Sequence, residues 1–289
     1  MKRAIVTGAS GGIGFETAKG LALRGYAVHL TGRNPQRTRE SAERIRVETG
    51  NERVRAYVAD FATLAGVREL AEALCDEAPK FHLLVNNAGL WMREFARTRD
   101  GFEMTHAVNH LAPTLLTHLL LPALVHDAPS RIVFVSSTVH RNVGPYDFAG
   151  SDPRGFRGIR AYGQSKLANV LTAFEFARRF RQTGRATICS AVHPGAVQTK
   201  IVRYNAFLSS AIRLAGPWIR TPAEGAETTL YAACEPSLAN VSGAYFSDCR
   251  QIPASPHARE ESAALRLWRQ TNRDLGLSEV HPSVAGSAA

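Results

Sequence analysis

Short apolar runs alternate along the chain with longer segments in which apolar residues recur every three or four positions. The short runs have the length of β-strands, and some are apolar throughout, which is typical of strands buried on both faces of a sheet. We expect strands at residues 3–7, 26–31, 54–59, 82–86, 131–136 and 186–192. The amphipathic segments predict helices at residues 13–24, 35–49, 63–77, 100–125 and 161–182.

The regular alternation of strand and helix predicts an α/β fold. Such a pattern favours a doubly wound parallel β-sheet with helices on both faces, and we expect one Rossmann-type domain over residues 1–277. Pro113 predicts a kink in the helix at 100–125, and the glycines and prolines of residues 139–160 predict a loop. The small and polar residues 278–289 predict a disordered tail.

Composition and charge exclude several classes of protein. Hydrophobic residues make up 45% and charged residues 21% of the 289, which is ordinary globular composition. The net charge is +10, and 30 of the 35 basic residues are arginine, but they are scattered along the chain. A nucleic-acid binder would cluster them and bind DNA with steep salt dependence, so we expect no nucleic-acid partner.

The sequence also argues against a membrane span, a disulfide framework and a metal site. No apolar run reaches the roughly 20 residues that cross a bilayer. An apolar strand and a glycine turn stand where a signal peptide would carry its apolar region. The four cysteines form no CxxC pair. We therefore expect a cytoplasmic protein without a metal.

A glycine-rich turn between the first strand and the first helix is the first candidate site. Glycines there let the backbone approach a phosphate and point free N–H groups at it from the helix N-terminus. A tight structural turn is the alternative, but the flanking strand and helix favour nucleotide binding. The expected cofactor contacts in this turn are Gly8, Ser10, Gly11, Gly12, Ile13 and Gly14.

The residues after the next three strands indicate which cofactor is bound. Arg33 and Asn34 follow the second strand, where an acidic residue would bind the ribose hydroxyls of NAD and an arginine accommodates the 2′-phosphate of NADP. We expect NADP(H) rather than NAD(H), with Arg37 or Ser10 as alternative readers of the phosphate. Further cofactor contacts are expected from Asp60, Phe61, Asn87, Ala88 and Gly89.

Tyr162 and Lys166 form the candidate catalytic pair, because a spacing of four residues places them on one face of a helix. A tyrosine is a poor acid–base group at neutral pH, and a neighbouring ammonium is expected to lower its pKa. Ser137, after the fifth strand, is expected across the cleft. Asn109, in the fourth helix, is expected to anchor a water beside Lys166. A surface pair is the plain alternative for Tyr162 and Lys166.

Taken together, these residues resemble the short-chain dehydrogenase/reductase superfamily. The matching positions occur in family order: Thr7, Gly8, Gly12, Gly14, Asn86, Asn87, Ala88, Gly89, Asn109, Ser137, Tyr162, Lys166, Pro194 and Gly195. Residues 108–111, 165–171, 192–195 and 242–249, with the 25-residue separation of Ser137 from Tyr162, look like the retinol dehydrogenase-type branch. The membrane-anchored members of that branch carry an apolar leader, whereas this sequence starts at its first strand.

The resemblance implies roles for individual residues. Ser137 would hold the substrate oxygen, Tyr162 would exchange the proton, Lys166 would tune Tyr162 and hold the nicotinamide ribose, and Asn109 would support a proton relay. Residues that would line the nicotinamide, with Tyr162 and Lys166, are Pro194, Gly195, Val197 and Thr199.

The expected function is that of an NADP(H)-dependent oxidoreductase that interconverts an apolar alcohol with its ketone or aldehyde. The arginine-rich composition suggests a ketoreductase of secondary metabolism, with a polyketide as one substrate class. The alternative is a catalytically silent NADP-binding sensor on the same fold. Such proteins usually lack the tyrosine or the lysine, and both are present. The substrate, the direction and the oligomeric state stay open.

Apolar and basic residues mix in the segment 200–220, after the Pro194–Gly195 turn. In this family the place is taken by a lid over the substrate, and an apolar lid would exclude water from hydride transfer. An ordinary amphipathic helix packed on the core is the alternative. The same segment would permit weak contact with a membrane surface.

Overall fold

The computed structural model describes residues 1–77, 80–125, 129–150, 152–195 and 220–277. Its centre is an eight-stranded sheet in the order β3-β2-β1-β4-β5-β6-β7-β8. Neighbouring strands pair in parallel as far as β7, and β8 runs antiparallel to β7. The strands are β1 Arg3–Val6, β2 Ala27–Gly32, β3 Val54–Val58, β4 Leu83–Asn86, β5 Arg131–Val135, β6 Ile188–His193, β7 Ala244–Ser247 and β8 Arg250–Gln251.

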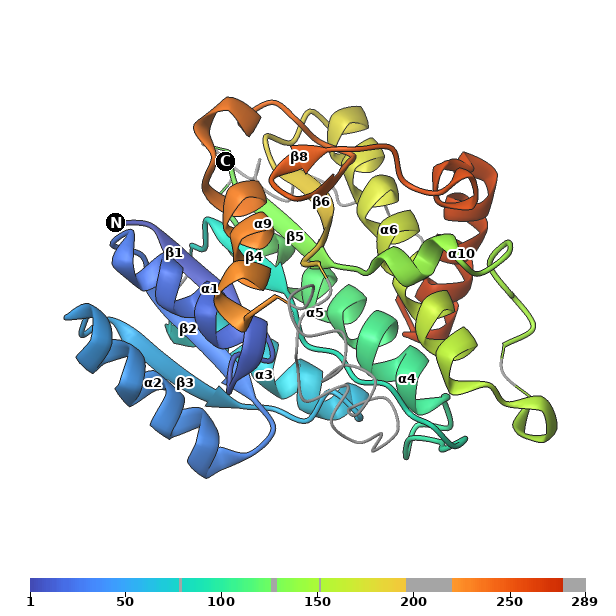
Figure 1. Ribbon diagram of the computed structural model, residues 1–289, viewed down its shortest axis with the longest axis horizontal. Coiled ribbons are helices and arrows are strands. Elements are labelled where there is room, and N and C mark those ends of the chain that lie inside the picture. The colour runs from blue at the N-terminus through green and yellow to red at the C-terminus, as the bar shows by residue number, and fades with distance from the viewer. Residues whose placement is uncertain (78–79, 126–128, 151, 196–219, 278–289) are drawn as a thin grey trace, which may run out of the picture.

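Helices cover both faces of this sheet (Figure 1). One face carries α1 Gly12–Leu23, α2 Pro35–Thr49 and α9 Pro222–Cys234. The other carries α3 Leu64–Glu77, α4 Met104–His106, α5 Ala112–Leu120, α6 Gly158–Gln182 and α10 Glu261–Asp274. A π-helical turn at Ala107–Leu111 joins α4 to α5. Short 3₁₀ turns lie at Leu121–Ala123, Thr138–Arg141, Pro153–Gly155, Pro236–Leu238 and Pro256–Arg259.

The two layers of core follow from the alternation of side chains along each strand. In β5, Ile132 and Phe134 pack under α5 and α6, whereas Val133 and Val135 pack under α1 and α9. All four side chains are buried. A strand with apolar residues on both faces is stable only between two helical layers, so the near-continuous apolar runs fix this architecture.

The expected fold class is confirmed, and several boundaries differ from the expectation. The expected helix at 100–125 begins at Met104 and contains the π-helical turn. Pro113, the second residue of α5, has no N–H to donate to the carbonyl of Asn109 four residues earlier, which favours the wider turn there. The long helix expected from residue 161 already begins at Gly158. The sequence analysis assigned no element to the chain beyond β6.

Helix α10 is held to the sheet through α6, chiefly by Trp268. Its indole is 4% exposed, packs edge-on against Phe176 with ring centroids 4.8 Å apart, and lies 4.3 Å from the guanidinium carbon of Arg179. Glu175, also buried, forms an ion pair with that same guanidinium at 2.7 Å. Aromatic packing therefore attaches the C-terminal helix to the face opposite α1.

We expect Trp268→Ala to lower the free energy of unfolding by about 3–5 kcal/mol, because a large buried side chain is replaced by a cavity. The affinity for NADPH should be unchanged, since Trp268 lies away from the carboxyl ends of the strands. Denaturant unfolding and NADPH titration measure the two quantities. Val47→Ala is the control, because Val47 is 75% exposed. Equal stabilities of the two variants would contradict the anchoring role of Trp268.

Candidate active site

The carboxyl ends of β1 to β6 open onto one cleft of about 560 Å³, the place where open α/β sheets bind ligands. Most of the predicted site residues line it: Gly8, Ser10, Gly11, Gly12, Ile13, Gly14, Arg33, Asp60, Phe61, Asn87, Ala88, Gly89, Ser137, Tyr162, Lys166, Pro194 and Gly195. Asn34 and Asn109 do not. Val197, Thr199 and residues 200–219 of the expected lid lie outside the described residues.

The glycine loop, residues 8–14, packs closely against the segment that follows β4. A Cβ on Gly14 would lie 2.4 Å from Nδ2 of Asn87, and one on Gly8 would lie 2.7 Å from Cα of Ala88. The same Asn87 amide donates to the carbonyl of Thr7 at 2.8 Å. Gly8 has a φ of 66°, in the left-handed region that favours glycine. Glycine is therefore required at both positions for space, and at Gly8 for conformation as well.

This loop fits a phosphate group. Helix α1 begins at Gly12 without any side-chain cap, so the first N–H groups of the helix have no side-chain partner. Gly12 has a φ of 59°, and a Cβ there would meet nothing within 4 Å, so the loop borders open space. An uncapped helix N-terminus that faces an open cleft is a binding place for an anion such as a dinucleotide pyrophosphate.

Two arginines stand at the end of the cleft formed by β2 and α2. Arg33 and Arg37 both line it and are exposed, and Nη2 of Arg37 lies 3.5 Å from the carbonyl oxygen of Ser10. Asn34 does not line the cleft and caps α2 instead. Its Oδ1 accepts the N–H of Arg37 at 2.9 Å as the N-cap of α2, so its side chain is directed to the helix rather than to the cleft.

Asp60 and Phe61 line the cleft beyond β3. Asp60 is exposed, and its Oδ1 accepts the N–H of Ala62 at 3.0 Å, which closes a turn at the end of the strand. Phe61 is 8% exposed and belongs to the core under α3. These two residues border the cleft at the same end as the arginines, because β3 pairs with β2.

Asn109 supports the cleft from behind. It is fully buried, its Oδ1 accepts the N–H of Leu90 at 2.7 Å, and its Nδ2 donates to the carbonyl of Leu90 and to Oγ of Ser165. A Cβ on Gly89 would lie 3.2 Å from Oδ1 of Asn109 and 3.3 Å from Nζ of Lys166. The amide therefore ties the segment after β4 to α6.

Lys166 and Tyr162 lie one turn apart on α6, with Nζ of Lys166 5.6 Å from the centre of the Tyr162 ring. Lys166 is 3% exposed and donates to the carbonyl of Val135 at 2.9 Å. Burial lowers the pKa of Lys166 to about 8. Burial raises the pKa of Tyr162 to about 12, and the Ser137 hydroxyl acts in the opposite direction.

The pKa of Tyr162 therefore moves in the direction opposite to the lowering expected from Lys166. Burial of the phenol outweighs every other influence, because the charged phenolate is poorly solvated there. At neutral pH the phenol is consequently neutral, whereas Lys166, with a pKa of about 8, still carries its proton. Ser137 faces this pair with a constrained hydroxyl, because its Oγ accepts the N–H of Val139 at 3.3 Å.

The cleft also has an apolar wall that the sequence analysis did not identify. Its members come from four separate segments: Leu90, Trp91, Val108, Val139 and Ile159. The Trp91 ring is tilted toward Tyr162, with centroids 6.5 Å apart, and Ile159 is 52% exposed. The one available signal was the apolar pair that directly follows Gly89. His193, at the end of β6, was also missed as a lining residue.

Comparisons with known proteins agree with this geometry. The family model for short chain dehydrogenases matches residues 2–206. Human "Retinol dehydrogenase 12" is 42% identical over 278 residues, which cover 96% of this chain and 87% of that protein. Bovine "Dehydrogenase/reductase SDR family member 13" is 42% identical over 282 residues, which cover 96% of this chain and 74% of that protein.

Solved structures give the same result. An uncharacterized protein from Mycobacterium paratuberculosis superposes with a TM-score of 0.78 at 28% identity, covering 96% of this chain and 94% of that one. A protein from Escherichia coli CFT073, classed as a short chain dehydrogenase and complexed with NADPH, superposes with a TM-score of 0.67 at 27% identity, covering 85% and 95%. This chain therefore belongs to the short-chain dehydrogenase/reductase family, in its retinol dehydrogenase-like branch.

Proposed function

We propose that this oxidoreductase uses NADP(H) to interconvert an apolar alcohol with its ketone or aldehyde. The observation that carries the proposal is the position of Tyr162, Lys166 and Ser137 in the same cleft as the uncapped glycine loop. When bound, the nicotinamide supplies or takes up the hydride. The protein binds the substrate, orients it and moves a proton at its oxygen atom.

In the reducing direction, Tyr162 is the proton donor. Its raised pKa keeps the phenol protonated at neutral pH, so a proton is available when the carbonyl oxygen becomes an alkoxide. Ser137 donates its hydroxyl hydrogen to that oxygen, because a developing alkoxide only accepts, and the Ser137 oxygen meanwhile accepts the N–H of Val139. Lys166, in its charged form, stabilises the phenolate as the proton leaves.

NADP(H) is favoured over NAD(H) by the two arginines that border the cleft after β2. Arg33 and Arg37 offer the guanidinium groups that suit a 2′-phosphate, and the residue directly after β2 is Arg33 rather than the acidic residue that would bind ribose hydroxyls. The Escherichia coli neighbour that was solved with NADPH supports the same choice.

An apolar substrate is favoured by the wall of Leu90, Trp91, Val108, Val139 and Ile159. The retinol dehydrogenase relatives support a large apolar alcohol or aldehyde. A polyketide ketone is the narrower alternative that the composition suggests. Across the ranges that the structure describes, no helix combines the length and the apolar character needed to span a bilayer. A cytoplasmic location stays a prediction.

A catalytically silent NADP(H) sensor is the second candidate. It would keep the glycine loop and the arginines but would have no need for a buried lysine beside a tyrosine. Burying Lys166 is unfavourable, as its lowered pKa indicates, and a cofactor sensor gains nothing from it. The enzyme is therefore the better supported of the two.

The first prediction concerns proton transfer. Tyr162→Phe removes the hydroxyl alone, so turnover should fall at least ~10²-fold while the dissociation constant for NADPH stays the same. A panel of all-trans-retinal, a steroid ketone, a polyketide ketone and small aldehydes, followed by NADPH absorbance, measures turnover. Tyr26→Phe is the control, because Tyr26 lies outside the cleft. Near-normal turnover in Tyr162→Phe would favour a different proton donor.

The second prediction concerns the choice of cofactor. Arg33→Asp removes a guanidinium and supplies an acceptor for ribose hydroxyls, so the ratio of kcat/KM for NADPH to that for NADH should fall by about tenfold or more. Arg37→Ala should lower it less. Arg39→Ala, an exposed arginine on α2 that does not line the cleft, should leave it unchanged. If this ratio of kcat/KM values is unchanged in both Arg33→Asp and Arg37→Ala, these two arginines do not recognise the 2′-phosphate.

The third prediction concerns the cost of burying Lys166. In the folded protein the pKa of Lys166 is about 8, against its ordinary value of 10.5, so below pH 8 the buried charge destabilises the folded state. The contribution of Lys166 to the free energy of unfolding must therefore rise between about pH 8 and pH 10.5. Lys166→Met removes the effect, and should also abolish turnover.

Thermal unfolding of both proteins from pH 7 to pH 10 tests this sign. The wild type should gain stability relative to Lys166→Met as the pH rises through that range. Lys2→Met, at an exposed position, should follow the wild type in parallel. Parallel curves for wild type and Lys166→Met would mean that Lys166 is not buried as a free ammonium.

A further inference from the structure

Two histidines hold the peptide group that follows Ser137. Nδ1 of His140 lies 2.6 Å from the carbonyl oxygen of Ser137. The N–H of Thr138 donates to Nδ1 of His193 at 3.3 Å. That carbonyl and that N–H belong to one planar peptide group, so the two imidazoles bind its opposite edges. We call His140 and His193 the imidazole clamp.

The partners of each ring define its protonation. A carbonyl only accepts, so Nδ1 of His140 carries the hydrogen, and its Nε2 accepts the N–H of Ser255 at 3.2 Å. Nδ1 of His193 accepts from Thr138, so the hydrogen of His193 is on Nε2. Both rings are therefore neutral, and they are opposite tautomers.

Burial keeps the clamp neutral. It lowers the pKa of His193 to about 4 and also lowers that of His140. Asp248 raises the pKa of His193, whereas Arg220, Arg141 and His140 lower it. His140 is fully buried. At neutral pH each ring thus keeps the one free lone pair and the one hydrogen that its partners require.

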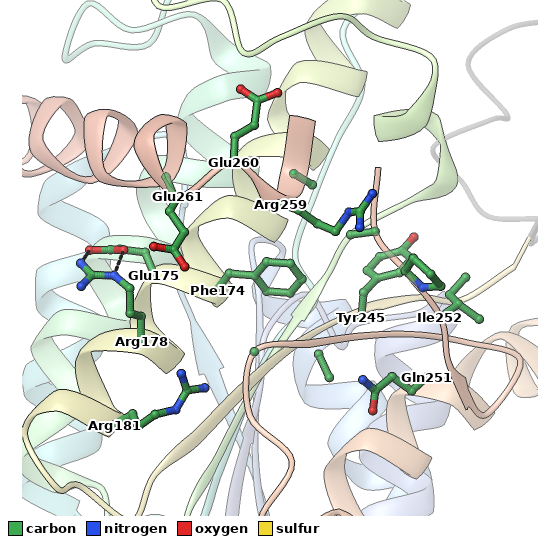
Figure 2. Close-up of a pocket in the computed structure, with 16 residues that line it drawn as sticks. Phe174, Glu175, Arg178, Arg181, Tyr245, Gln251, Ile252, Arg259, Glu260 and Glu261 are labelled. Carbon is green, nitrogen blue, oxygen red and sulfur yellow. Dashed lines mark hydrogen bonds and ion pairs between the residues drawn. The ribbon is translucent and has the colours of Figure 1, made fainter. Parts of the chain in front are cut away.

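The two histidines of the clamp and the ring that packs against His140 come from three neighbouring strands or the turns that follow them. His140 lies in the 3₁₀ turn after β5, His193 ends β6, and the ring of Tyr245 in β7 packs edge-on against His140 at 5.0 Å. Figure 2 shows that Tyr245 and Ile252 line a second hollow beyond this contact, formed with Phe174 of α6. Pro253 and Ala254, which lead to Ser255, belong to the wall of that hollow.

We propose that His140 and His193 are positioning residues that fix the direction of the Ser137 hydroxyl. The ψ angle of Ser137, 152°, describes rotation about the bond that joins its Cα to the clamped peptide group. Holding that group in place fixes the backbone from which the Ser137 side chain extends, and the hydrogen bond from the N–H of Val139 to Oγ restricts rotation of the side chain itself. The inference rests on the proposed function of Ser137 and assigns the clamp no contact with the reacting atoms.

Substitution of His140 by asparagine or by glutamine tests its two hydrogen bonds one at a time. An asparagine amide occupies the place of Nδ1 and can still donate to Ser137, whereas a glutamine amide reaches the place of Nε2 and can serve only Ser255. His140→Asn should retain kcat within about threefold, and His140→Gln should lower it by about 10–100-fold, as expected when a transition-state contact is misplaced. KM for NADPH should change little in both.

The same comparison applies to His193. His193→Asn offers Oδ1 to the N–H of Thr138 and should rescue much of the kcat that His193→Leu loses. His29→Asn is the control for loss of a buried imidazole, because His29 on β2 is 4% exposed and hydrogen-bonds Tyr57 instead. It should lower the melting temperature without lowering kcat. If His140→Gln fails to fold, the His193 pair carries the test alone.

A double-mutant cycle with Ser137→Ala decides whether the clamp acts through Ser137. In the Ser137→Ala background, His140→Gln and His193→Leu should have almost no further effect on kcat, because the group they position is gone. An equal fold-loss of kcat in both backgrounds would overturn the proposal and assign the histidines to general stability. The panel member with the highest kcat/KM serves as substrate.

Histidine ¹⁵N NMR of the wild type with and without NADPH gives a readout independent of turnover. Hydrogen on Nδ1 of His140 and on Nε2 of His193 supports the clamp even if no carbonyl of the panel is reduced, in which case the proposed function alone fails. The reverse tautomer at either ring, or a charged ring at pH 7, would overturn the clamp.

Discussion

The hydrogen bond from Nζ of Lys166 to the carbonyl of Val135, at 2.9 Å, is the interaction on which the rest of the site depends. A buried ammonium must be satisfied by acceptors, and the carboxyl end of β5 supplies one. The hydroxyl of Ser136 donates back to the carbonyl of Lys166 at 2.7 Å, and Nδ2 of Asn169 donates to the carbonyl of Val135 at 3.4 Å, so three hydrogen bonds fix α6 to the end of β5. These bonds place Tyr162 on the cleft beside Ser137, and they leave a Cβ at Gly89 only 3.2 Å from Oδ1 of Asn109 and 3.3 Å from Nζ of Lys166.

The packing of α6 against the sheet also determines how Tyr162 and Lys166 are solvated. Lys166 is buried where α6 meets β5, and Tyr162 is partly buried at the cleft, so poor solvation raises the pKa of the phenol and lowers that of the ammonium. A protonated tyrosine at neutral pH suits the delivery of a proton to a developing alkoxide. The family membership and the cleft thus agree on carbonyl–alcohol chemistry, while the apolar wall determines the kind of substrate that fits.

Local signals in the sequence predicted the fold and most of the site. The glycine turn and the spacing of Tyr162 and Lys166 depend on one loop and one helix, and both are placed as expected. Asn34 caps α2 through its side chain, a role that an asparagine before a proline commonly takes, and its contact with the cofactor stays a prediction. The meeting of His140 and His193 depends on the parallel register of β5 and β6, in which Val135 lies opposite Val192. Such long-range pairing leaves no mark at either histidine, and the same holds for the apolar wall.

The most direct test of the account is the fate of the hydride. NADPH that carries deuterium at the transferred C4 position is incubated with the protein and each carbonyl of the panel, and the products are analysed by mass spectrometry and NMR. The account predicts an alcohol with one deuterium at its carbinol carbon for a large apolar carbonyl, and none without the protein. Tight binding of the labelled NADPH with no deuterium in any product would contradict the central claim and leave a cofactor-binding protein without reductase activity.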